Sequence, residues 1–160
     1  MEKVKKSTEK QKKANPVPEG FHTVTPFLIA KNASKFMDFL QNAFGGMVTY
    51  NMKSDDGKVM HATVKIGDSL LMVSDPTEKF GPVSSMLYLY VDDVDTVYER
   101  ALKANATPIR KPVDEFYGDR SAGLKDEWGN QWWIATHIED VSDAELKKRM
   151  KEYQPQEEEV

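Results

Sequence analysis

The sequence contains no cysteine, which excludes disulfide bonds, thiolate metal ligands and a cysteine nucleophile. It also lacks any apolar run near the roughly 18 residues that a membrane-spanning helix needs, so we expect no membrane partner. Residues 1–20 are rich in lysine and have no apolar core typical of a secretory signal, which favours a cytoplasmic protein. A net charge of −4 at pH 7 argues against nucleic acid as a partner.

Several well-known catalytic motifs are absent too. The chain has no Gly-rich phosphate loop, no Gly-x-Ser-x-Gly nucleophile elbow and no helical His-Glu-x-x-His. The paired carboxylates Asp55-Asp56 and Asp92-Asp93 fall in a turn and at a helix start, where we expect structural roles.

The composition is that of an ordinary folded protein. With 160 residues, 39% of them hydrophobic and 30% charged, the chain forms either one large domain or two small fused ones. We divide it into a disordered basic lead at 1–20, a folded domain at 21–141, and a C-terminal helix with an acidic tail at 142–160. Ser142 opens the capping box SDAE, which predicts where the last helix begins.

The folded domain contains a repeated order of strand, helix and three strands. The predicted segments are 22–30, 33–44, 47–52, 59–66 and 69–74 in the first half, and 86–91, 94–105, 107–109, 120–125 and 131–136 in the second. An offset of 61 residues places Thr25 on Met86 and the helix-capping Asn32 on Asp93. The sequence therefore predicts an α+β fold of two tandem βαβββ modules, at 21–75 and 86–137. We expect them to form one strongly curved mixed sheet, with helices outside and a concave cavity inside.

Alternation along the strands predicts which residues face that cavity. Trp132 and Trp133 must point opposite ways, so one packs into the core and the other lines the sheet. The cavity-facing set is rich in aromatic and sulfur-containing side chains, which suits a ligand-sized cavity. The candidate ligand-binding residues are Thr25, Phe27, His61, Thr63, Met86, Tyr88, Tyr90, Tyr117, Arg120 and Trp133.

Two candidates carry chemistry. His61 is a candidate catalytic base, because histidine titrates near neutral pH; a hydrogen bond to a tyrosine or a backbone carbonyl is the alternative. Arg120 is expected to open toward the cavity mouth and clamp an anionic group, with pairing to Asp126 or Glu115 as the alternative. Asp119 is expected to cap its hairpin turn. His22 and His137 are expected to lie at the surface.

The repeat and four segments carry a resemblance to a known family. With TPFLIAKNASKFMDFLQNAFGG, HATVKIGDSLLMVSD, YVDDVDTVYERA and FYGDRSAGLKDEWGNQWW, the chain resembles the vicinal-oxygen-chelate superfamily, the glyoxalase, bleomycin-resistance and extradiol-dioxygenase fold, and its PhnB-like subgroup in particular. The resemblance implies a homodimer, because paired subunits commonly complete the cavities in this family.

The resemblance also implies where a metal would bind. Metal-dependent members hold a divalent cation with four His or Glu ligands, which correspond here to Thr25, about Leu71, Met86 and Trp133. A slip of one residue finds Pro26, Met72, Leu87 and Trp132, and neither set supplies imidazole or carboxylate. We therefore predict no metal ligands and no cofactor.

The predicted function is metal-independent binding of a small organic molecule in an aromatic-lined cavity. The alternative is a metal-dependent or His61-assisted lyase, isomerase or dioxygenase of the same superfamily, so the sequence leaves open whether the protein is an enzyme. A third reading is an interaction module whose cavity is filled by its own side chains.

Overall fold

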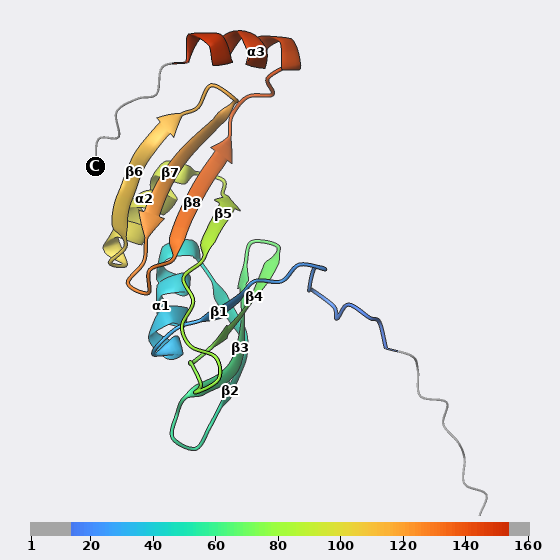
Figure 1. Cartoon of the computed structure of the whole chain (residues 1–160), viewed down its shortest axis with the longest axis vertical. Helices are drawn as coiled ribbons and strands as arrows, with labels where there is room; N and C mark the ends of the chain where they lie inside the picture. The colour runs from blue at the N-terminus through green and yellow to red at the C-terminus, as the bar shows by residue number, and fades with distance from the viewer. Residues whose placement is uncertain (1–13, 154–160) are drawn as a thin grey trace, which may run out of the picture.

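The computed structural model describes residues 14–153 of the 160-residue chain (Figure 1). Module one comprises β1 (Phe27–Ile29), α1 (Ala33–Phe44), β2 (Met47–Lys53), β3 (Val59–Ile66) and β4 (Ser69–Ser74). Module two comprises β5 (Met86–Tyr90), α2 (Val94–Lys103), β6 (Thr107–Asp114), β7 (Asp119–Lys125) and β8 (Gln131–His137), and α3 (Asp143–Glu152) follows. Most of the predicted lead (1–13) and of the acidic tail (154–160) lies outside the described residues.

Each module forms its own four-stranded mixed sheet. The strand orders are β1-β4-β3-β2 and β5-β8-β7-β6, with β1 parallel to β4, β5 parallel to β8 and the other neighbours antiparallel. The predicted α+β, two-module βαβββ fold is confirmed. The strands form two separate sheets rather than one continuous sheet, because the modules meet through their helices and core side chains.

The structure confirms the repeat at an offset of 61. Phe27 pairs with Met72 between β1 and β4, and Tyr88 pairs with Trp133 between β5 and β8. The first backbone N–H of each helix also donates its hydrogen bond to a side chain at an equivalent position. Ala33 N–H donates to Asp75 (3.1 Å) and Val94 N–H donates to Thr136 (2.9 Å), each at the end of its module's last strand.

The first strand is shorter than predicted. It was expected over 22–30 but begins at Phe27. Pro26 has no N–H to donate to a ladder, and the hydroxyl of Thr25 donates to the carbonyl of His22 (3.0 Å), which turns the chain locally. Thr25 therefore lies before the strand.

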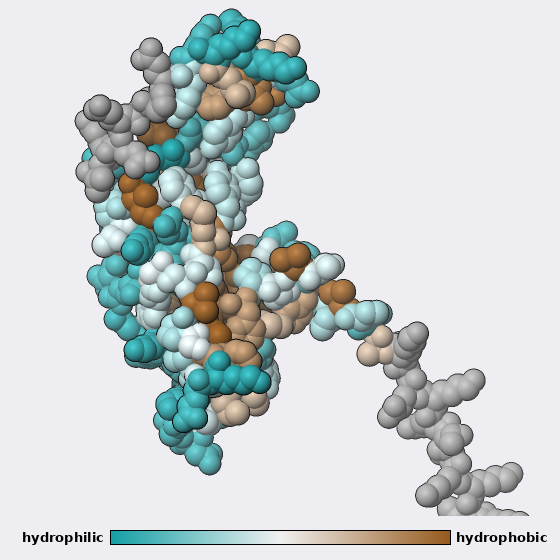
Figure 2. Space-filling view, in the orientation of Figure 1, coloured by the Kyte–Doolittle hydropathy of each residue, from teal (hydrophilic) through white to brown (hydrophobic). Residues whose placement is uncertain are grey.

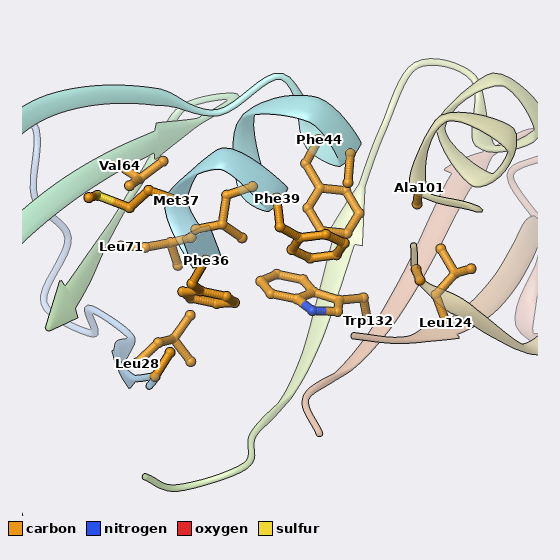
Figure 3. Close-up of a cluster of buried hydrophobic side chains, with 14 of the residues drawn as sticks. Leu28, Phe36, Met37, Phe39, Phe44, Val64, Leu71, Ala101, Leu124 and Trp132 are labelled. Carbon is orange, nitrogen blue, oxygen red and sulfur yellow. The ribbon is translucent and has the colours of Figure 1, made fainter. Parts of the chain in front are cut away.

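A shared aromatic core joins the modules (Figure 3). Trp132 of β8 is fully buried, with its ring centroid 4.7 Å from that of Phe44 and 6.4 Å from that of Phe39, both on α1. Arg100 of α2 donates to the carbonyl of Ala43 (2.8 Å), one of the free carbonyls at the end of α1. These contacts hold α1 beside α2 and leave the other face of each sheet uncovered.

A buried carboxylate organises the turn before β8. Asp126 accepts from the backbone N–H groups of Trp128 (2.9 Å) and Asn130 (2.8 Å) and from the indole N–H of Trp132 (2.8 Å). Gly129 has φ +88°, a conformation that glycine adopts without strain, and this closes the turn.

The last helix, α3, begins at the predicted capping box. The hydroxyl of Ser142 accepts from the N–H of Glu145, and Arg149 pairs with Glu139 and Glu145 while donating to the carbonyl of Phe116. In the described part of the chain, no helix combines the length and the apolar character needed to cross a membrane.

Candidate functional site

The uncovered faces of the two sheets carry large apolar side chains that remain partly exposed. Tyr88 is 49% exposed, Phe27 48%, and Met86 and Tyr90 each 67%. Figure 2 shows hydrophobic residues gathered near the hollowed middle of the molecule. We call these two surfaces the open faces, and they contain most of the predicted ligand-binding residues.

On the open face of module one, four side chains form a row across the sheet. Phe27, Met72, Thr63 and Tyr50 are register partners from β1 to β2. A hollow of about 520 Å³ lies against this face and is lined by Tyr50, His61 and Thr63 among others. The row is neutral and largely apolar.

His61 lies on this face, as predicted, between two aromatic rings. Its ring centroid is 6.0 Å from that of Phe27 and 6.2 Å from that of Tyr50. Within residues 14–153 neither ring nitrogen of His61 makes a hydrogen bond with a tyrosine or a backbone carbonyl. Its imidazole therefore borders the hollow without a fixed orientation from such a partner.

On the open face of module two, the corresponding row is Tyr88, Trp133, Gly123 and Arg110. Gly123 is needed because a Cβ there would lie 3.1 Å from the indole ring of Trp133, which covers it. The guanidinium of Arg110 lies over the same indole, 5.0 Å from the ring centroid. The indole of Trp133 is thus in close contact with the Gly123 backbone and with the Arg110 guanidinium.

Arg110 belongs to a largely buried polar cluster that the sequence patterns did not predict. The Nη2 group of Arg110 lies 2.5 Å from a carboxylate oxygen of Glu115 and donates a hydrogen bond to the hydroxyl of Ser121 (2.6 Å). The Ser121 hydroxyl in turn donates to the same carboxylate of Glu115 (3.0 Å). The Glu115 side chain is only 7% exposed. Within residues 14–153, Nε of Arg110 is buried and has no hydrogen-bond partner. The repeat held a signal for this cluster, because Arg110 and Gly123 lie 60 residues beyond Tyr50 and Thr63.

A second polar cluster surrounds Asp119. The Tyr90 hydroxyl donates to one oxygen of this buried carboxylate (3.0 Å), and Nδ1 of His137 lies 2.7 Å from the other. Nε2 of His137 lies 2.8 Å from Asp140. Hydrogen bonds to Asp140, the larger contribution, and to Asp119 raise the pKa of His137. The hydrogen bond to Asp119 also raises the pKa of Tyr90. The Asp119 side chain therefore bonds to two other strands instead of capping its hairpin turn as expected. His137, expected as an ordinary surface residue, is part of this network.

Tyr88 and Tyr117 face each other beside this cluster. Partial burial of the Tyr88 hydroxyl, and then the neighbouring Tyr117, raise the pKa of Tyr88 well above its usual range. The hydroxyl therefore keeps its proton at neutral pH and is able to donate a hydrogen bond. Tyr117 lies in the β6–β7 turn and is 39% exposed. Both predicted residues therefore border the open face of module two.

Arg120 lies on the opposite face, so the expectation that its strand directs it to the cavity mouth is wrong. Its guanidinium donates two hydrogen bonds to Asp95 of α2 (2.7 and 2.8 Å) and one to Asp114 (2.9 Å). On β7, Asp119, Ser121 and Gly123 face the open side, so Arg120 lies on the helix side. The alternative pairing with Asp126 or Glu115 is also not the one formed.

The four positions that correspond to a family metal site do not suit a cation. Thr25 lies before β1, and Leu71 is buried on the helix side, so Met72 is the β4 residue on the open face. Thioether, phenyl, phenol and indole groups are poor ligands for a hard or borderline divalent ion. In the described part of the chain, no three His, Asp or Glu side chains are grouped so as to hold a metal.

A wider cleft of about 850 Å³ opens at the surface where the two modules meet. The β3–β4 turn at Gly67 and Asp68 forms one wall, and β5 with Arg100 of α2 forms the other. Tyr88 and Tyr90 border this cleft as well as the open face, so it is continuous with the candidate site.

Comparison with known proteins agrees with this architecture. The family model described as Glyoxalase/Bleomycin resistance protein/Dioxygenase superfamily matches residues 20–134. The uncharacterized protein Mb0911c of Mycobacterium bovis is 28% identical over 138 residues, covering 79% of this chain and 91% of that protein.

Solved structures share the fold at lower identity. TioX from Micromonospora sp. ML1 has a TM-score of 0.60 at 21% identity and covers 72% of this chain and 99% of its own. The PhnB protein from Bacillus cereus has a TM-score of 0.56 at 19% identity, with 72% and 99% covered. The extent of the family match decides the assignment: this chain belongs to the Glyoxalase/Bleomycin resistance protein/Dioxygenase superfamily.

Proposed function

We propose that this protein binds a small, partly aromatic organic molecule on the open faces of its sheets, without a metal. The observation that carries the proposal is the arrangement around Trp133, whose indole is fixed by close contacts with Gly123 and Arg110 beside the half-exposed Tyr88. Rigid aromatic side chains with a few fixed polar groups are typical of small-molecule sites. Sequestration of an aromatic compound is the version of this function that we favour, as the family's bleomycin resistance proteins suggest.

A second copy of the chain is part of the proposal. Each open face by itself is a one-sided surface, and a ligand lying on it would keep much of its area in water. A homodimer in which module one of one copy faces module two of the other would enclose the ligand on both sides. Light scattering coupled to size-exclusion chromatography measures this directly, and a monomer at working concentration would contradict it.

An enzymatic function using His61 is the second candidate. The imidazole borders the hollow of module one, beside Phe27 and Tyr50, where it is able to accept a proton from a bound molecule. This candidate predicts turnover that is lost in His61→Gln with ligand binding retained. Binding without turnover in both proteins would leave the sequestration function.

The test of the proposed function is ligand binding by calorimetry, with 2-naphthamide as a neutral aromatic probe. Trp133→Ala removes the flat indole, and we expect binding at least about tenfold weaker. Phe80→Ala is the matched control, because Phe80 is an exposed aromatic residue in the loop between the modules. Equal affinity in the wild type and in Trp133→Ala would overturn the proposal.

A further inference from the structure

We infer that the site selects neutral aromatic molecules that carry a carbonyl group or a similar hydrogen-bond acceptor, and that Arg110 and Glu115 make this selection. The inference rests on the proposed function and adds the chemical class of the ligand. It concerns the polar cluster of Arg110, Glu115, Ser121 and Trp133 on the open face of module two.

Arg110 is placed as a donor at one end of the aromatic row on the open face of module two, on the edge strand β6. Its guanidinium lies over the indole of Trp133, so a ligand that lies on the open face across Tyr88 and Trp133 would have this cation within reach of a substituent. Only Nη2 has protein partners among residues 14–153, and both are side chains of the same cluster. A planar guanidinium fixed in this way supplies directional donors to a carbonyl oxygen.

Glu115 cancels the charge that would otherwise attract an acid. Its carboxylate lies 2.5 Å from Nη2 of Arg110 and is 7% exposed, so the pair is neutral overall and poorly screened by water. A ligand carboxylate approaching Arg110 would lie close to this second carboxylate and would compete for the same donors. A neutral carbonyl accepts a hydrogen bond from Arg110 without disturbing the pair.

The surrounding charges act in the same direction. Asp119 is buried on the same face, so an anion gains nothing from this neighbour. On module one, Lys65 lines the hollow, but Asp68 lines it too. The Arg110–Glu115 pair is therefore the feature that sets the preference.

The experiment compares two probes of nearly equal shape, 2-naphthamide and 2-naphthoate, by calorimetry at neutral pH. We expect the wild type to bind the amide at least about tenfold more tightly than the acid. Glu115→Gln keeps the size of the side chain and an oxygen for Arg110 and Ser121. In this variant we expect the ratio to shift at least about tenfold toward the acid.

Two further variants make the result specific. Asp114→Asn also removes one negative charge, but the Asp114 side chain is 66% exposed and pairs with Arg120 on the other face. We expect this variant to leave the ratio of amide to acid affinity unchanged. Arg110→Lys keeps the cation but loses the planar donors. We expect it to lose the preference for 2-naphthamide over 2-methylnaphthalene, which keeps the test decisive if Glu115→Gln does not fold.

The outcomes separate the inference from the proposed function. If the wild type binds none of the three aromatic probes, the proposed function itself is wrong. If it binds them with an amide-to-acid ratio that neither Glu115→Gln nor Arg110→Lys changes, the charge selection is wrong while aromatic binding stands.

Discussion

The two modules repeat one backbone frame but carry different chemistry on their open faces. The strand pairing is the same in both modules, because the pair Phe27–Met72 corresponds to the pair Tyr88–Trp133 at an offset of 61 residues. Module one presents a neutral surface with a single histidine, whereas module two presents a buried ion pair and a Tyr–Asp–His network. Repetition therefore fixes where side chains lie, and each module's own residues decide what they recognise.

The same difference is seen in the core. Module two supplies the large residue at the boundary, Trp132, where module one has Leu71 at the equivalent position, 61 residues earlier. Trp132 packs on Phe39 and Phe44 of the other module, so its burial stabilises both halves together.

Trp132→Ala is expected to have the largest effect. It removes a fully buried indole from the shared core, which we expect to lower the free energy of unfolding by about 4 kcal/mol, against about 3 kcal/mol for Leu71→Ala. Denaturant unfolding followed by circular dichroism gives both values. Trp133→Ala is the matched control, because the neighbouring indole lies on the open face, and we expect it to lose less than half as much. Equal losses at both tryptophans would show that the modules share no core.

The helix-start contacts provide the second test. The Asp75 carboxylate accepts two backbone amides, those of Ala33 and Val59 (2.8 Å), whereas the Thr136 hydroxyl accepts one, from Val94. Hydrogen bonds to a charged group are the stronger kind, so we expect Asp75→Ala to cost about 2–3 kcal/mol and Thr136→Val about 1 kcal/mol. Asp68→Ala, at an exposed turn, is the control for losing a charge. The reverse order would show that the two helix starts are not held as the structure indicates.

The His137 network predicts a smaller, pH-dependent effect in module two. Asp140 and Asp119 raise the pKa of His137 above its usual value near 6.5, so its stabilising contribution is complete below about pH 6.5 and is lost as the pH rises through the raised value. We expect the difference in melting temperature between wild type and His137→Gln to be largest at low pH and to shrink in alkaline buffer. Asp140→Asn should reduce that pH dependence. A difference that stays constant across this range would show that the network does not stabilise the charged imidazole.

Divalent metals are expected to have no effect. The positions that would share a metal between the modules carry Phe27 or Thr25, Met72, Met86 or Tyr88, and Trp133, so we expect Ni²⁺, Zn²⁺, Mn²⁺ and Fe²⁺ to leave the melting temperature unchanged. Elemental analysis of protein purified without chelators should find less than one metal ion per chain. One tightly held ion per chain would contradict this and make metal-dependent catalysis the leading function.

The sequence predicted the features that depend on near neighbours. The repeat, the two helix starts and the opposite orientations of Trp132 and Trp133 follow from local geometry. The length of β1 was wrong, because Pro26 has no N–H for strand pairing and the Thr25–His22 hydrogen bond turns the chain before it. The face of Arg120 was wrong because a charged residue on the helix side is stable only when α2 brings Asp95 to it.

The sequence predicted only part of the candidate site. His61, Thr63, Tyr88 and Trp133 lie on the open faces as alternation predicted. Arg110 was missed because the sequence indicated only the start of a strand at 107–109, whereas β6 continues past Pro112 to Asp114. Its partner Glu115 lies beyond the end of that strand, where no sequence period applies.

The amino-acid sequence by itself therefore determined the family, the two-module fold and the aromatic character of the open faces. Periodicity and turn chemistry act over a few residues, and the repeat doubles their signal. Only the tertiary structure decided which polar groups meet, namely Arg110 with Glu115 and Asp119 with Tyr90 and His137. These contacts form between segments up to 29 residues apart, because strand register and burial bring them to one face.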